Sequence, residues 1–82
     1  MPITSKYMNW RDLVLDCVQD LCDKKKSREF NLSEIYRYES KMSGYYPDND
    51  HIEEKIRQQL QVLRDENVLI FIDDNGNYKY IG

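Results

Sequence analysis

The side chains best suited to chemistry lie in one stretch near the middle of the chain, residues 46–65. They are His51, Glu54, Arg57, Gln58 and Gln61. Arginine and glutamine on neighbouring turns of an exposed helix can make paired hydrogen bonds to the edges of guanine and adenine. The spacing makes this a candidate DNA recognition helix, with Arg57, Gln58 and Gln61 as base-reading candidates and His51 as a donor to phosphate or base. On spacing alone an ordinary solvated helix face is the favoured interpretation, because both residue types are good helix formers.

Apolar residues in the same stretch indicate which side of this helix is buried. They stand at i, i+4, i+8 and i+11 and are Ile52, Ile56, Leu60 and Leu63. This spacing is that of one stripe on an amphipathic helix. Either Asn49 or Asp50 is expected to cap the helix, and Asp50 with Glu53 makes the better capping box. The helix should extend to about Asp65.

An earlier helix is expected to begin after Asn9. This residue is a suitable N-cap, Asp12 follows at the third helical position, and an apolar stripe that starts at Trp10 continues to about Asp23. Core packing is the favoured role of Trp10. Residues 1–8 are expected to form a short lead, which leaves 9–82 as the folded domain.

Another helix should follow a short extended segment. Asn31 and Glu34 form a second capping box, and the helical pattern continues from about Leu32 to Ser40. Met42 is expected near the edge of this helix, and Ser43-Gly44 should then break it.

The pattern changes after Asn67 to that of a β-hairpin. Residues 68–72 and 77–81 are rich in β-branched and aromatic side chains, and Asn75-Gly76 between them is typical of a type I′ turn. A two-residue turn would pair Ile72 with Lys79. One face of the hairpin would then carry Leu69, Phe71, Tyr78 and Tyr80. The opposite face would carry Ile70, Ile72 and Ile81.

The predicted order is helix, extended segment, helix, loop, helix and hairpin. This is the order of an α+β winged helix-turn-helix domain, with three helices and a C-terminal β-hairpin wing. In such a domain the third helix reads DNA, and Lys79 on the wing is a candidate phosphate contact.

Composition narrows the possible functions. A chain of 82 residues predicts one domain with little room for an enclosed active site. The net charge of −3 argues against binding to phosphates through charge alone. Cys17 and Cys22 are five apart and are expected to be free thiols, with Cys17 buried, and one histidine makes a zinc site improbable. We expect no cofactor, no metal, no membrane segment and a cytoplasmic location.

Two charged segments invite functional interpretations. The basic run of residues 24–28 suits either a solvated loop at a helix C-terminus or a phosphate contact. Pro47-Asp48 followed by Glu53-Glu54-Lys55 has the residue order of metal-dependent nucleases. That chemistry needs carboxylates that converge on a metal from adjacent strands, whereas this spacing is short and helical. We therefore expect a protein that is not an enzyme.

Specific residues carry a resemblance to a known family. The segments are Phe30-Asn31-Leu32-Ser33-Glu34-Ile35-Tyr36, Tyr46-Pro47-Asp48-Asn49-Asp50-His51-Ile52 and Lys55-Ile56-Arg57-Gln58-Gln59-Leu60-Gln61-Val62-Leu63-Arg64-Asp65. Over roughly residues 10–81 the chain resembles the C-terminal winged-helix domain of DpnI-type and Dam-replacing restriction endonucleases. In that family the domain follows a nuclease domain and binds DNA that contains N6-methyladenine in a GATC context.

The resemblance implies a non-catalytic reader of N6-methyladenine that binds double-stranded DNA through the major groove. A nuclease domain or a partner chain is a further implied partner. The implied DNA-contacting residues are Tyr46, Asn49, His51, Lys55, Arg57, Gln58 and Gln61. The faces of Tyr45 and Tyr46 could pack on a methyl group, or one of the two tyrosines could hold the loop to the core.

The sequence departs from the family pattern in two acidic places. Carboxylates surround the start of the third helix, where the family tends to have asparagine, and the wing segment 73–77 replaces a Gly-Arg-rich wing. Exposed carboxylates repel phosphate, which leaves a second hypothesis open. In it, the domain is an acidic protein-interaction module that docks a partner through Tyr45, Tyr46 and the wing.

Overall fold

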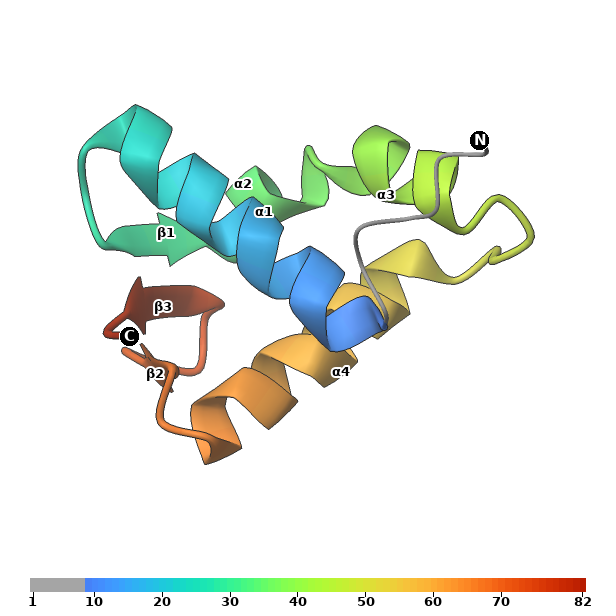
Figure 1. Cartoon of the computed structure of the whole chain (residues 1–82). Coiled ribbons are helices and arrows are strands. Elements are labelled where there is room, and N and C mark those ends of the chain that lie inside the picture. Colours follow the sequence, from blue (N-terminus) through green and yellow to red (C-terminus); the bar gives the residue numbers. More distant parts are fainter. Residues whose placement is uncertain (1–8) are drawn as a thin grey trace.

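A computed structural model describes residues 9–82, so the lead expected for residues 1–8 lies outside the described residues. One short strand lies between the first two helices, and two further strands follow the last helix. The elements are α1 (Trp10–Lys25), β1 (Glu29–Asn31), α2 (Leu32–Tyr36), α3 (Glu39–Tyr45), α4 (Ile52–Asp65), β2 (Leu69–Phe71) and β3 (Asn77–Tyr80). In Figure 1, α1 crosses α4, and the small sheet lies at one end of both helices. The arrangement confirms the predicted α+β winged-helix class.

Side-chain caps begin the first two helices as predicted. Asn9 Oδ1 accepts a hydrogen bond of 2.9 Å from the backbone N–H of Asp12. Asn31 and Glu34 form the reciprocal capping box, with two side-chain to backbone bonds of 2.9 Å each. Such caps stabilise a helix by about 1 kcal/mol, because they satisfy N–H groups that lack a partner within the helix. α1 continues two residues past the predicted end.

The segment predicted as one helix over 32–40 consists of two short helices. α2 ends at Tyr36, and Tyr38 is anchored to α1 because its hydroxyl donates to Asp20 Oδ2 over 2.7 Å. α3 then continues through Ser43 and Gly44 to Tyr45, so the break expected at Ser43-Gly44 is wrong. Met42 on α3 is fully buried rather than at an edge. Burial of this side chain holds the second short helix, and a local propensity scale does not include such a contact.

The apolar stripe of α4 forms much of the core. Its four predicted residues, Ile52, Ile56, Leu60 and Leu63, are all buried. They pack with buried residues of α1 such as Leu13 and Val14. The helix itself begins at Ile52, with His51 in the N-cap position and no side-chain cap there. The predicted cap by Asp50 or Asn49 is therefore wrong, because Asn49 Oδ1 instead accepts from the backbone N–H of His51 at 2.8 Å.

The sheet has three antiparallel strands in the order β1-β3-β2. Ile70 pairs with Lys79, so the predicted pairing of Ile72 with Lys79 is wrong by two residues. Ile72 N–H donates to Asn77 O at 2.8 Å, which leaves a four-residue loop of 73–76. Gly76 has a φ of +82°, whereas Asn75 is not among the positive-φ residues of the described chain. A type I′ turn needs positive φ at both central positions, so the loop adopts another turn.

The predicted faces of the hairpin are nevertheless correct. Side chains alternate with a period of two, and a register shift of two residues keeps each side chain on its face. Leu69 and Tyr78 are buried against the helices, whereas Ile70 and Ile72 are exposed on the outer face.

Both cysteines are free and buried in the helical core. Burial raises the pKa of the Cys17 thiol to about 11, because the interior disfavours the thiolate. The prediction of a buried thiol at Cys17 is confirmed. None of the helices within residues 9–82 combines the length and apolar character needed to cross a membrane.

Candidate nucleic-acid interface

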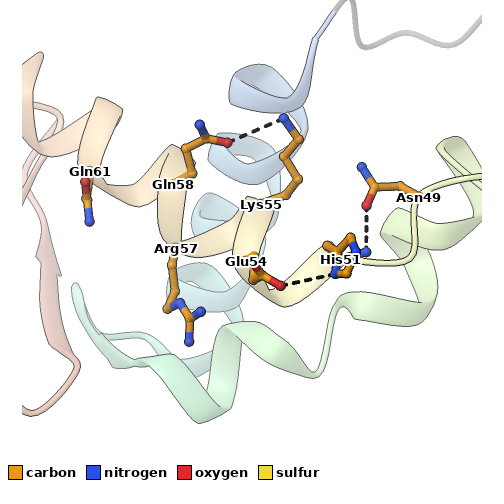
Figure 2. A pocket seen from close by; sticks show the side chains of 7 residues that line it. All are labelled: Asn49, His51, Glu54, Lys55, Arg57, Gln58 and Gln61. Carbon is orange, nitrogen blue, oxygen red and sulfur yellow. Dashed lines mark hydrogen bonds and ion pairs between the residues drawn. The ribbon is translucent and has the colours of Figure 1, made fainter.

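The side of α4 opposite its apolar stripe forms an open, shallow hollow, which we call the α4 face. It is lined by Asn49, His51, Glu54, Lys55, Arg57, Gln58 and Gln61 (Figure 2). Six of these seven residues were predicted as DNA contacts. The amphipathic pattern explains this arrangement, because burying the isoleucines and leucines of one stripe turns the polar residues of the other side outward.

Hydrogen bonds between neighbours orient the side chains of the α4 face (Figure 2). Lys55 Nζ donates to Gln58 Oε1 over 3.4 Å, one helical turn away. This bond engages the amide oxygen, so the amide nitrogen is the group that Gln58 offers as a donor. His51 Nδ1 lies 3.1 Å from Glu54 Oε1. The face therefore presents donors and one carboxylate acceptor side by side.

Arg57 connects the α4 face to α2. Its Nη1 donates to the Tyr36 hydroxyl over 3.4 Å, and Tyr36 is the last residue of α2. The guanidinium remains exposed and keeps further N–H donors for a ligand. An arginine held in this way can present the planar fork that suits guanine or phosphate.

Two predicted contacts lie outside the α4 face. Tyr46 stacks on Trp10 with ring centroids 4.5 Å apart and an angle of 20° between the rings. This contact ties the loop before α4 to the start of α1, as expected if one tyrosine holds the loop. Lys79 is half-buried on β3, paired with Glu29 and Ile70 on either side.

The basic run of residues 24–28, which begins in the last turn of α1, is largely engaged within the domain. Lys24 Nζ lies 3.0 Å from Asp20 Oδ2, and Lys25 Nζ lies 2.8 Å from Glu34 Oε1. Arg28 donates to the backbone oxygen of Tyr80. Lys25, followed by the N–H of Asn31, lowers the pKa of Glu34, because both stabilise its carboxylate. These contacts favour a structural role for the run over a phosphate contact.

One acidic residue of the wing also has a structural role. The Asp73 carboxylate accepts from the Asn77 side chain at 2.9 Å and from the backbone N–H of Asn75 at 2.8 Å. These bonds, that of Asn77 first, lower the pKa of Asp73. The Asp73 carboxylate thus shapes the four-residue loop.

The predicted set of DNA contacts omitted one residue of the α4 face, Glu54, although the sequence placed it on the polar side of the helix. The signal was its spacing: Glu54, Gln58 and Gln61 stand at i, i+4 and i+7 and share one side of the helix. Among residues 9–82, no group of three or more histidine, cysteine or carboxylate side chains is placed to hold a metal ion.

A comparison with family models finds one match that covers nearly the whole chain. The model described as "Dam-replacing HTH domain" matches residues 6–80. The matched range includes every element of the fold and every residue of the α4 face.

Proposed function

The chain belongs to the Dam-replacing HTH domain family, and from this premise we propose that it reads N6-methyladenine in double-stranded DNA through the α4 face. Membership of a helix-turn-helix family implies binding to double-stranded DNA. The finer proposal concerns the object that is read, an adenine-methylated, GATC-like site in the major groove.

One observation carries the proposal: six predicted contact residues gather in one open hollow, formed by the polar side of α4 and the residues just before it. They are Asn49, His51, Lys55, Arg57, Gln58 and Gln61. The major groove is wide enough for a helix, and it displays acceptors on guanine and adenine that arginine, lysine and glutamine side chains can reach. An exposed helix face with these residue types matches that requirement.

Support for methyl reading comes from the segments 46–52 and 55–65 that carry the family resemblance. An N6-methyl group projects into the major groove, where it lies in the path of a reading helix. Burial of one methyl contributes about 0.8 kcal/mol, which corresponds to a preference of about fourfold. Two methyl groups, one on each strand of a palindromic site, would together give roughly 15-fold.

The proposal predicts a graded response to methylation. Fully methylated, hemimethylated and unmethylated GATC duplexes of otherwise identical sequence would be titrated at one stated low salt concentration. We expect the fully methylated duplex to bind about 15-fold more tightly than the unmethylated one, with the hemimethylated duplex between them. A GTAC duplex with the same base composition is the control for binding without sequence preference. Equal affinity for all three methylation states would refute methyl reading.

A second candidate function has its own supporting observation. Three isoleucines of the hairpin region are well exposed: Ile70 at 43% on β2, Ile72 at 46% just after β2, and Ile81 at 44% just after β3. Together with Tyr45, which is 37% exposed, they favour an acidic interaction module that docks a protein partner. If so, Arg57→Ala and Gln58→Ala would leave DNA affinity unchanged while a partner binds through Tyr45, Tyr46 and the wing.

A further inference from the structure

Glu54 occupies the outermost line of the α4 face. Glu54, Gln58 and Gln61 succeed one another at i, i+4 and i+7, on the side of α4 opposite the buried Ile56 and Leu60. The Glu54 side chain is 67% exposed. A major groove whose base edges approach Gln58 and Gln61 therefore also lies beside this carboxylate, which is within about two helical turns of both.

A carboxylate can only accept hydrogen bonds, which restricts what it can read. The base edges of the major groove offer two kinds of donor, the N6 amine of adenine and the N4 amine of cytosine. In N6-methyladenine one of the two amine hydrogens is replaced by the methyl group, and the other pairs with thymine. A fully methylated GATC site thus keeps one kind of base-edge donor in its major groove, the N4 amine of its cytosines.

We propose that Glu54 is a specificity-determining residue that accepts a hydrogen bond from the cytosine N4 amine of the G·C pair flanking the methylated adenine. This inference rests on the proposed function, and it deepens that function by assigning a base to an acidic residue. The Glu54 carboxylate then weakens binding to DNA in general, because it repels phosphate. At a site with a cytosine N4 amine in reach, the hydrogen bond to that amine offsets this repulsion.

The contact with His51 supports this role. With Nδ1 3.1 Å from Glu54 Oε1, the imidazole engages one carboxylate oxygen and leaves Oε2 as an acceptor for a ligand. Pairing with a neighbour on the same turn also restricts the rotamers of the glutamate before DNA arrives.

The adjacent residue, Glu53, supplies a matched control. It is exposed and belongs to the same first turn of α4, but it does not line the α4 face. Replacing either glutamate with alanine removes the same charge at nearly the same place, so both variants should show the same general electrostatic change in DNA affinity. Only Glu54→Ala should also lose the contact with the base.

The test compares two fully N6-methylated GATC duplexes, one with ordinary cytosine and one with N4-methylcytosine at the flanking pair. N4-methylation preserves Watson–Crick pairing and removes the hydrogen that faces the groove. For the wild-type chain we expect the N4-methylated duplex to bind about tenfold more weakly, the effect of one hydrogen bond to a charged group. Glu54→Ala should reduce this ratio to below about twofold, and Glu53→Ala should retain it.

Each other outcome overturns a distinct claim. Indifference of the wild type to N4-methylation, a ratio retained by Glu54→Ala, or a ratio lost equally in Glu53→Ala would overturn the role of Glu54. Sensitivity to N4-methylation without sensitivity to N6-methylation would support Glu54 and contradict methyl reading. No binding to any duplex would overturn both. Circular dichroism of each variant confirms that it is folded.

Discussion

Replacing Arg57 with alanine is expected to lower the affinity for the preferred duplex by roughly 5- to 150-fold, the range for loss of one paired base contact. The reason is geometric. Arg57 is exposed on the α4 face and is steadied by the Tyr36 hydroxyl, so its planar fork is available to a guanine edge. Titration by fluorescence anisotropy at several salt concentrations would measure the change.

Two further variants separate a base contact from a phosphate contact. Arg57→Lys keeps the charge but not the paired geometry, so we expect it to restore less than half of the lost binding free energy. Arg64→Ala removes the same side chain from α4 outside the α4 face, where Arg64 lies 4.5 Å from the centroid of the Phe71 ring. This control should lower the affinity for every duplex by a similar small factor. Equal losses in Arg57→Ala and Arg64→Ala would argue against base reading by Arg57.

Replacing Leu60 with alanine is expected to reduce the free energy of unfolding by about 2–5 kcal/mol. Leu60 is fully buried, and it lies at the middle of the stripe by which α4 packs on the rest of the domain. Truncation leaves a cavity and removes apolar contact, and small domains have total stabilities of only about 5–15 kcal/mol. Denaturant unfolding followed by circular dichroism would give the difference.

The neighbouring Gln61→Ala is the matched control for stability. Gln61 is exposed on the α4 face, so its removal should change the free energy of unfolding by less than about 0.5 kcal/mol. The two variants thus divide α4 into a structural side and a binding side. If Leu60→Ala lowered the free energy of unfolding by less than about 1 kcal/mol, the placement of the apolar stripe in the core would be contradicted.

Much of the fold was predictable because local signals agreed with the tertiary structure. The caps at Asn9 and Asn31 are local hydrogen bonds, and the stripe of α4 is a strict helical repeat. The same repeat, seen from its polar side, predicted most of the α4 face. Patterns of this kind need no knowledge of distant contacts.

The wrong predictions share a different cause, in which a competing contact decides the local geometry. Asn49 was expected as a possible helix cap, but its side chain turns the loop instead by accepting from His51 N–H. The helix expected over 32–40 is divided because Tyr38 reaches Asp20 on α1 and Met42 enters the core. Asp20 is 18 residues from Tyr38, and Met42 is buried in the assembled core, so a local pattern reveals neither of these two contacts.

The site shows the same division. From the sequence, Tyr46 could either contact DNA or hold the loop to the core, and the fold shows that it stacks on Trp10, which is far from it in the chain. Glu54 was expected on the polar side of the helix but not as a DNA contact, because the role of its carboxylate depends on the donors and acceptors that surround it on the α4 face.

The central claim, that the α4 face is the surface that meets DNA, is tested most directly by mapping backbone amide shifts in NMR spectra. The isotope-labelled chain would be titrated with a fully methylated GATC duplex. The largest shifts are expected for residues 49–61, with small changes for the outer face of the sheet at Ile70 and Ile72. Shifts confined to Tyr45, Tyr46 and the wing segment 73–77 would contradict the claim. The absence of shifts at every duplex concentration would contradict it as well.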